Sequence, residues 1–277
     1  MISERPLIFV LVCTLDDGIH KVPKVLLPPQ DGVRYVVSWQ QTHTHDAPPA
    51  DLLREDVIMT TLEGRGLSRN RNHAMETAMS LVVDMLEDIV FILADDDERF
   101  YSDSFTKIRS FYNQHPKLDA ALMRLRSNYD GSYFKSYPQS LMRYGHHPRS
   151  YYPASLELTF RSRVWAMNIR FDERFGLGSE LLCAGEEDIF LTDMLRKGLL
   201  IYIFPEDIAS TDPVTTGTYV LDSKVLRSKG AVYGYQRTLA SAFLRSWREA
   251  LSLGCKHRVA PWRLFRELWY GVKYIRS

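Results

Sequence analysis

An acidic run, residues 95–98 (DDDE), follows an apolar segment of strand length at residues 89–94. Adjacent carboxylates repel one another unless a cation neutralises them, and Mg²⁺ or Mn²⁺ prefers a few carboxylates together with phosphate oxygens. Open α/β sheets bind their ligands at the carboxyl ends of the strands. The run therefore predicts a metal site that also binds a phosphorylated ligand, and the alternative is a solvated acidic loop that caps a helix.

The segment of residues 64–73 (GRGLSRNRNH) opens a predicted helix. Ser68 is expected to cap it, because a buried stripe of spacing three to four follows at Met75, Met79, Val82 and Leu86. Free N–H groups at a helix start, together with Arg65, Arg69 and Arg71, suit a diphosphate. The glycine and lysine spacings of a Walker loop or a dinucleotide fingerprint are absent. The alternative is a capped surface helix with solvated arginines.

A third segment, residues 185–198 (GEEDIFLTDMLRKG), predicts a helix that ends at Gly198 and carries three acids in its first turn. Carboxylates at this position are favoured by the helix dipole, so a stabilising cap is one interpretation. The other is a carboxylate base at a reaction centre, a group that contributes about 10²- to 10⁴-fold in rate.

These segments lie within an alternation of strand and helix patterns. Strands are expected at residues 7–15, 33–39, 56–60, 89–94 and 118–122, with helical patterns between several of them. Such alternation predicts an α/β fold with a mainly parallel sheet covered by helices. No clean period is found in residues 126–153, which predicts long loops over one face of the sheet that carry specificity.

The composition is that of a globular enzyme: 277 residues, 45% hydrophobic and 25% charged, with three cysteines. It excludes collagen, low-complexity disorder and a disulfide scaffold. Cys13, Cys183 and Cys255 lie far apart and predict reduced thiols in the cytoplasm. No stretch approaches the roughly 18 to 20 apolar residues that span a bilayer, and residues 7–15 predict a buried strand rather than a signal peptide.

Charge divides the chain into an expected catalytic domain, residues 1–220, and a basic extension, residues 221–277. The extension has 12 Lys or Arg and 3 Asp or Glu, giving 12 − 3 = +9, whereas the first 220 residues have 23 bases and 31 acids, or −8. Helices with tryptophans interleaved by arginines predict contact with a membrane surface, and no nucleic-acid binding is expected. The alternative is an amphipathic cap that packs on the sheet.

Taken in order, the segments resemble the inverting family 2 glycosyltransferases of GT-A fold. The matching segments are residues 7–14, 37–41 (VSWQQ), 66–72 (GLSRNRN), 94–97 (ADDD), 171–178 (FDERFGLG) and 185–188 (GEED), and the resemblance covers about residues 7–218. It implies a Rossmann-like, mainly parallel sheet, here followed by a C-terminal helical extension. It also implies transfer of a sugar from a nucleotide-diphosphate donor, with UDP the commonest nucleotide among relatives.

The resemblance also implies roles for individual residues. Donor binding falls to Thr14, Asp17, Gln40 or Gln41, Arg69, Arg71, Asn72, Asp95 and Asp96. Metal binding, of Mn²⁺ or Mg²⁺, falls to Asp95 and Asp97, the division of labour within the triplet staying open. Asp188, with Glu187 beside it, matches the catalytic base. Relatives often have a metal-binding His where this chain has Thr211 and Asp212, and Asp212 is the better substitute ligand.

The leading interpretation is therefore a metal-dependent glycosyltransferase that acts on a glycan or lipid-linked acceptor in surface polysaccharide biosynthesis. It is expected in the cytoplasm, peripheral at the inner face of the membrane. One alternative is a metal-dependent nucleotidyl or phosphoryl transferase, since clustered aspartates serve those reactions as well. The other is a non-catalytic partner subunit that binds sugar nucleotides, an idea that the missing His encourages.

Overall fold

The computed structural model describes residues 5–43, 47–82, 88–148, 150–212 and 220–277. Within these ranges the chain forms two compact units. The first comprises the residues up to 65, residues 69–170 and residues from 194 to 212. The second comprises residues 66–68, residues 171–193 and the C-terminal residues from 220 onward. Leu86, the last member of the predicted helical stripe, lies outside the described residues.

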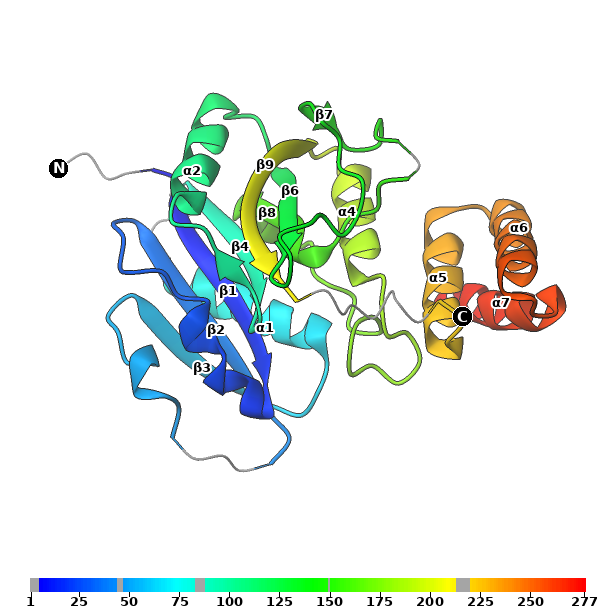
Figure 1. Cartoon of the computed structure of the whole chain (residues 1–277), viewed down its shortest axis with the longest axis horizontal. Coiled ribbons are helices and arrows are strands. Elements are labelled where there is room, and N and C mark those ends of the chain that lie inside the picture. The colour runs from blue at the N-terminus through cyan, green and yellow to red at the C-terminus, as the bar shows by residue number, and fades with distance from the viewer. Residues whose placement is uncertain (1–4, 44–46, 83–87, 149, 213–219) are drawn as a thin grey trace. The chain divides into compact units, whose positions relative to one another are not determined.

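The first unit is built on one curled sheet whose nine described strands run in the order β3-β2-β1-β4-β8-β6-β9-β5, with β7 paired to β9 (Figure 1). Strands β1 to β4, β6 and β9 run parallel, and β5, β7 and β8 run antiparallel to their neighbours. The bounds are β1 Leu7–Leu15, β2 Val33–Gln41, β3 Val57–Glu63, β4 Ile89–Asp95, β5 Arg99–Phe100, β6 Ala120–Ser127, β7 Met142–Arg143, β8 Leu158–Arg161 and β9 Ile201–Thr211. All five predicted strands are confirmed.

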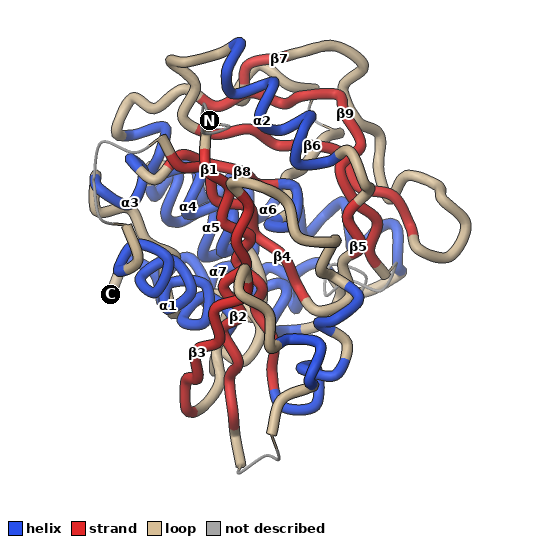
Figure 2. Tube along the Cα trace, turned by 90° about the vertical axis from the view of Figure 1, so that its left-hand side faces the viewer, coloured by secondary structure: helices blue, strands red, loops and turns tan. Residues whose placement is uncertain are grey.

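Helical segments cover both faces of the sheet, which explains the unbroken apolar runs of β1 and β4 (Figure 2). Val10 and Ile92 share a core with α2 (Ser104–Gln114) and with the short turns η1 (Asp16–His20) and η2 (Val22–Lys24). On the other face, the rings of Phe9, Phe91 and Phe160 pack edge to face. The shorter elements are η3 (Ala50–Leu52), η4 (Ser155–Glu157) and α3 (Arg163–Ala166).

A helix follows Gly66, as predicted, but α1 spans Leu67–Ser80, so both its start and its end differ from the prediction. Ser68 is the second helical residue rather than the cap, and its hydroxyl donates to the Phe175 carbonyl at 2.7 Å. Met75 is fully buried, whereas Val82 lies beyond the last helical residue. The prediction of Ser68 as a cap was wrong because a contact distant in sequence takes its hydroxyl.

The second unit is helical. Its helices are α5 (Ser223–Gln236), α6 (Leu239–His257) and α7 (Pro261–Arg276), together with most of α4 (Glu186–Arg196). Asp222 caps α5 by accepting from the N–H groups of Lys224 and Val225. Helices α5 and α7 approach closely where a Cβ on Gly271 would meet the Arg227 carbonyl. The expected domain boundary at residue 220 stays a prediction, and the second unit also includes residues 171–193.

The predictions about the cysteines and about membrane-spanning segments can be compared with the described residues. Cys13, Cys183 and Cys255 are all free thiols. None of the helices in the described ranges combines the length and the apolar character that crossing a bilayer requires.

Candidate functional site

The carboxyl ends of β1 and β4 are joined by a hydrogen bond between side chains. The Thr14 hydroxyl donates to Asp96 Oδ2 at 2.8 Å, and Lys21 Nζ lies 3.6 Å from Asp96 Oδ1. Gly18 lies so close that an added Cβ would overlap both Asp96 Oδ2 and Thr14 Oγ1. The turn after β1 therefore needs glycine at this position for the backbone to approach the carboxylate.

The turn η1 is held in place by Asp16, which has a left-handed backbone conformation with φ of 47°. Its two carboxylate oxygens accept from the backbone N–H and the hydroxyl of Thr42, each at 2.7 Å. Its carbonyl accepts from Trp39 Nε1 at 2.9 Å. Asp17, the residue expected to contact the nucleoside, is exposed on the same turn.

Buried polar atoms collect on the side of β1 and β2 that α1 covers. Gln40 is 3% exposed, and its Nε2 has no hydrogen-bond partner in the described part of the chain. The same holds for Ser38 Oγ and Asn70 Oδ1, while Asn70 Nδ2 donates to the Thr14 carbonyl at 3.1 Å. A buried donor or acceptor without a partner costs about 1–3 kcal/mol, so such groups are normally satisfied by water or a ligand.

Arg71 is the arginine that the structure brings to the acidic run. It is 2% exposed, Nη1 donates to Ser155 Oγ at 2.8 Å, and Nη2 lies 3.5 Å from Asp95 Oδ1. Arg69 is exposed and donates to the Glu63 carbonyl at 2.9 Å, at the end of the edge strand β3. Two residues along a helix correspond to about 200° of rotation, so the two guanidinium groups occupy opposite faces. Asn72, which follows Arg71 directly in sequence, is half-buried.

A pair of neighbouring carboxylates, Asp97 after β4 and Asp212 after β9, lies at the same edge of the sheet. Asn128, directly after β6, donates from Nδ2 to the Asp97 carbonyl at 3.1 Å and to Asp212 Oδ1 at 3.3 Å. Burial and the nearby charge of Asp212 raise the pKa of Asp97, and a hydrogen bond from Thr211 opposes the shift. Asp97 and Asp212 are 115 positions apart in sequence (212 − 97), and the antiparallel pairing of β5 with β9, in which Arg99 lies opposite Ser210, brings them together.

The carboxylates at this edge meet some of the demands of a divalent ion. Within the described ranges, the structure contains no cluster of three or more His, Cys, Asp or Glu side chains of metal-binding geometry. Asp97 and Asp212 are nevertheless two like charges held near each other, a repulsion that a cation would relieve. Mg²⁺ and Mn²⁺ sites use one or two carboxylates, with phosphate oxygens and water completing the shell. The pair fits that chemistry, with Asp95 engaged by Arg71.

Glu98 completes the acidic run but differs from its neighbours. It is fully buried, and neither carboxylate oxygen has a hydrogen-bond partner in the described part of the chain. Burial, followed by the charges of Asp95 and Asp97, raises its pKa well above the usual range. Glu98 therefore holds a proton more readily than an exposed glutamic acid does.

In the second unit, α4 begins with the three acids that the sequence singled out. Gly185 precedes them with φ of +91°, and a Cβ there would lie 2.8 Å from Val232 Cγ2. Glu186 is buried, whereas Glu187 and Asp188 are half-buried. The Asp188 carbonyl accepts from the Thr192 hydroxyl at 2.6 Å, an ordinary contact within the helix. The Asp188 carboxylate thus lies in the first helical turn, where the dipole stabilises its ionised form.

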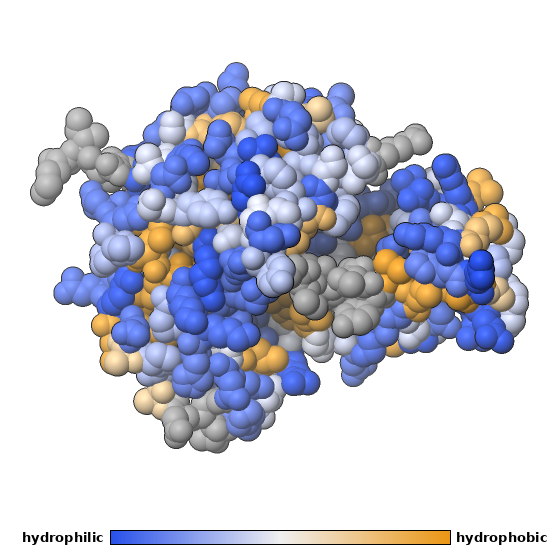
Figure 3. Space-filling model, viewed as in Figure 1, coloured by the Kyte–Doolittle hydropathy of each residue, from blue (hydrophilic) through white to orange (hydrophobic). Residues whose placement is uncertain are grey.

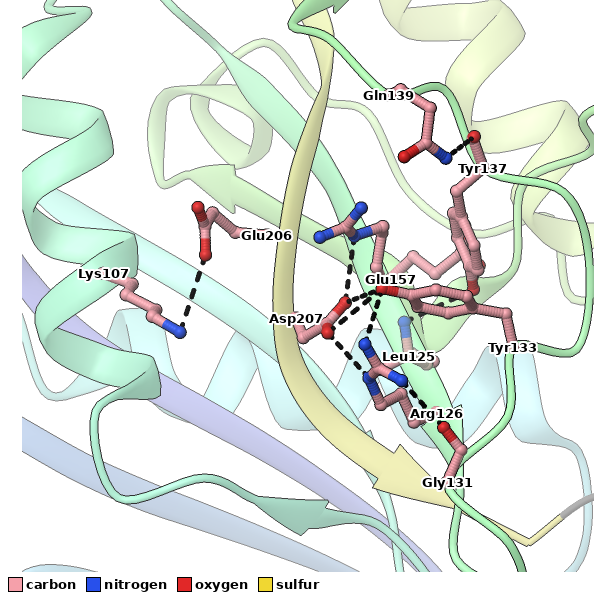
Figure 4. A network of polar contacts seen from close by, with 11 residues as sticks. Lys107, Leu125, Arg126, Gly131, Tyr133, Tyr137, Gln139, Glu157, Glu206 and Asp207 are labelled. Carbon is pink, nitrogen blue, oxygen red and sulfur yellow. Dashed lines mark hydrogen bonds and ion pairs between the residues drawn. The ribbon is translucent and has the colours of Figure 1, made fainter.

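The irregular segment after β6 is fixed by two polar networks of the first unit (Figure 4). Arg126 Nε donates to Asp207 Oδ2 at 2.7 Å, and its Nη2 donates to the Tyr133 hydroxyl at 2.8 Å. Further along, Glu157 accepts from the hydroxyls of Tyr137 at 2.6 Å and Tyr151 at 2.7 Å. Contrary to the expectation of loops alone, the segment includes strand β7, which pairs with β9.

Four residues that contact the predicted groups were missed in the sequence: Gly18, Lys21, Asn128 and Ser155. Asn128 could have been found, because it follows a strand whose carboxyl end lies at the same edge as the acidic run. Ser155 carries no such signal, since its contact with Arg71 joins residues 84 positions apart.

The sheet order, the parallel core and the polar groups at its carboxyl edge define a GT-A glycosyltransferase fold, so the predicted fold class is confirmed. The solved structures that share it include the following three. S. aureus TarS 1–349 has TM-score 0.58 and 13% identity, covering 98% of this chain and 83% of that one. Its complex with UDP-GlcNAc has TM-score 0.56 and 13% identity, covering 98% and 84%. Mannosyltransferase PcManGT from Pyrobaculum calidifontis, in complex with GDP-Man and Mn²⁺, has TM-score 0.52 and 14% identity. The match covers 98% of this chain and 87% of that one.

At the level of sequence, no protein-family model and no curated protein matches the chain. Identities of 13–14% to the solved structures establish the fold alone.

Proposed function

We propose that the protein is an inverting glycosyltransferase of the family 2 type, which transfers a sugar from a nucleotide-diphosphate donor, UDP-linked, to a glycan or lipid-linked acceptor. The observation that carries the proposal is the arrangement at the carboxyl edge of the sheet. There a buried arginine, a threonine–aspartate pair and two neighbouring carboxylates occupy the ends of β1, β4, β6 and β9. The UDP-GlcNAc and GDP-Man complexes of proteins with this fold support a sugar-nucleotide donor.

Each residue of the edge has a chemical task in this proposal. The amide nitrogen of Gln40, which has no partner in the described part of the chain, would donate a hydrogen bond to the nucleobase. Thr14, Asp17 and Asp96 would contact the nucleoside. Arg71 offers a fixed cation to the diphosphate, because Ser155 and Asp95 hold its guanidinium. Asn72 would assist there, whereas the contact of Arg69 with Glu63 makes it a weaker candidate than the sequence indicated.

Asp97 and Asp212 would hold the divalent ion, Mn²⁺ or Mg²⁺, with Asp95 close to the donor. Bound there, the ion would supply electrostatic stabilisation of the charge that develops on the departing diphosphate. The Mn²⁺ complex of PcManGT supports a metal in a protein of this fold.

Asp188, with Glu187 beside it, is proposed as the base. Its carboxylate would take the proton of the acceptor hydroxyl while that oxygen forms the new bond to the anomeric carbon. The bond from that carbon to the diphosphate oxygen breaks on the opposite face, so the configuration inverts. The ionised carboxylate needed for this step is favoured by the first helical turn.

The test combines nucleotide binding with turnover. Isothermal titration with UDP should give binding that strengthens when Mn²⁺ is present, and Asp97→Asn should abolish the Mn²⁺-dependent part. Asp188→Asn should keep binding while turnover of the best donor in a nucleotide-sugar screen falls by about 10²- to 10⁴-fold. Asp51→Asn and Glu180→Gln are the matched controls, since both residues are exposed acids outside the proposed site.

Three outcomes would count against the proposal. Absence of nucleotide binding with and without Mn²⁺ would remove the donor site. Unchanged turnover in Asp188→Asn would remove the base. Nucleotide binding with no turnover of any sugar donor would favour the non-catalytic partner subunit.

A further inference from the structure

Helices α6 and α7 present large apolar side chains to solvent. Leu244 is 67% exposed, Trp262 57%, Phe243 43%, Leu251 42% and Trp247 39%. We call these five residues the α6–α7 face. Figure 3 shows apolar and strongly hydrophilic residues side by side on this part of the second unit. Contiguous exposed apolar residues mark a surface that binds something, whereas scattered ones need no explanation.

The exposure is not a sign of poor packing, because both helices already bury another face. Ala250 and Leu253 of α6 share a core with Leu264 and Leu268 of α7. The aromatic residues at the edge of the α6–α7 face are held in fixed contacts: the ring centroids of Phe243 and Phe265 are 5.2 Å apart, and those of Trp247 and Phe265 are 5.0 Å apart. The helices therefore carry a second, ordered apolar face outside their core.

The acids of this region are already neutralised within it. Glu249 pairs with Lys229 at 3.2 Å and with Arg245 at 3.6 Å, and Glu267 pairs with Arg227 at 2.8 Å. The third acid of residues 221–277, Asp222, caps α5. Exposed cations without an acidic partner in the described part of the chain remain at Arg248, Lys256, Arg258, Arg263 and Lys273. These five cations are part of the net charge of +9 of residues 221–277 and are available at the surface.

We propose that the α6–α7 face docks on the surface of an anionic membrane. The tryptophan and leucine side chains match the acyl-chain layer of a membrane surface, and the unpaired arginine and lysine side chains match its anionic headgroups. A second copy of the chain is a poorer occupant, since a symmetric contact would press one set of unpaired cations against an identical set. The inference uses the second unit alone and does not require the proposed transferase activity.

Sedimentation of the full chain with vesicles tests the proposal. Vesicles with one third phosphatidylglycerol in phosphatidylcholine should carry the protein down, pure phosphatidylcholine vesicles should bind far less, and added salt should weaken the anionic binding. Arg248→Gln, Arg263→Gln and Lys273→Gln together should lower the partition coefficient by about 100-fold, at about fivefold for each cation near the surface.

Apolar variants test the other half of the surface. Leu244→Ser and Trp262→Ser should each lower vesicle binding by about tenfold, and their exposure makes misfolding no obstacle. The controls come from the first unit: Leu53→Ser, at 75% exposure, and the triple variant Lys24→Gln, Arg34→Gln and Lys117→Gln should bind as the parent chain does.

The proposal is overturned if the full chain stays in solution with anionic vesicles, or if face and control variants bind equally. It is also overturned if light scattering shows a dimer that Leu244→Ser dissociates, because the occupant is then a second copy. UDP titration of the same variants separates the two proposals: vesicle binding without nucleotide binding removes the transferase function and leaves the membrane surface intact.

Discussion

Tyr151→Phe removes one hydroxyl from the buried Glu157 network and should destabilise the first unit. The Tyr151 hydroxyl donates to Glu157 Oε2 at 2.7 Å, and both side chains are at most 4% exposed. Among the described residues, Oε2 would then keep only the Ala154 N–H at 3.3 Å. Loss of a hydrogen bond to a buried charged group costs about 1.5–3 kcal/mol. The free energy of unfolding of a typical domain is about 5–15 kcal/mol, so the variant should still fold.

The same change should depend on pH. Burial raises the pKa of Glu157 above its usual 4.5, while Lys135 and the hydroxyls of Tyr137 and Tyr151 oppose the shift. Without one hydroxyl the pKa of the folded state rises further, and the folded state binds the proton more tightly than the unfolded state does. The cost is therefore full at pH values above the raised pKa and declines as the pH falls through it, since protonated Glu157 needs the donor less.

Urea unfolding at neutral pH and near pH 4.5, followed by circular dichroism, measures both effects. Tyr129→Phe is the matched control, because Tyr129 is 89% exposed and its hydroxyl loss should stay within about 0.5 kcal/mol. A loss below that level for Tyr151→Phe, or a loss that is the same at both pH values, would refute an ionised Glu157 that depends on the tyrosine donors.

Two glycines provide further predictions. In Gly271→Ala the new Cβ meets the backbone carbonyl of Arg227, so α5 and α7 must separate. Thermal unfolding should show a loss of about 1–3 kcal/mol in the free energy of unfolding. Ser252→Ala, at an exposed position of α6, is the control and should show no change. In Gly18→Ala the new Cβ displaces the hydrogen-bonded side chains of Thr14 and Asp96 at the end of β1. UDP titration should show weaker binding, and thermal unfolding should show a comparable loss of stability. Unchanged UDP binding would place that turn outside the donor site.

The sequence by itself determined the strands, the fold class and the place of the acidic run. Apolar runs of strand length separated by helical patterns can be buried only in a helix-covered sheet, so residues 89–94 had to end at the ligand-binding edge. Helical periodicity also indicates which of two arginines lies on the buried face of the helix. Arg71 continues the buried stripe of Ala74, Met75 and Ala78, and Arg69 does not.

Tertiary structure alone decided which distant groups meet. Asp97 neighbours Asp212 because β5, which begins two residues after Asp97, pairs antiparallel with β9, and Arg71 reaches Ser155 across 84 positions. Tertiary contacts also explain why Ser68 does not cap the helix, since its hydroxyl donates to the Phe175 carbonyl instead. Local patterns fix which face of an element is buried, but strand order and register are set by the packing of the whole chain. For that reason the carboxylate pair and the buried tyrosine network could be described only from the folded protein.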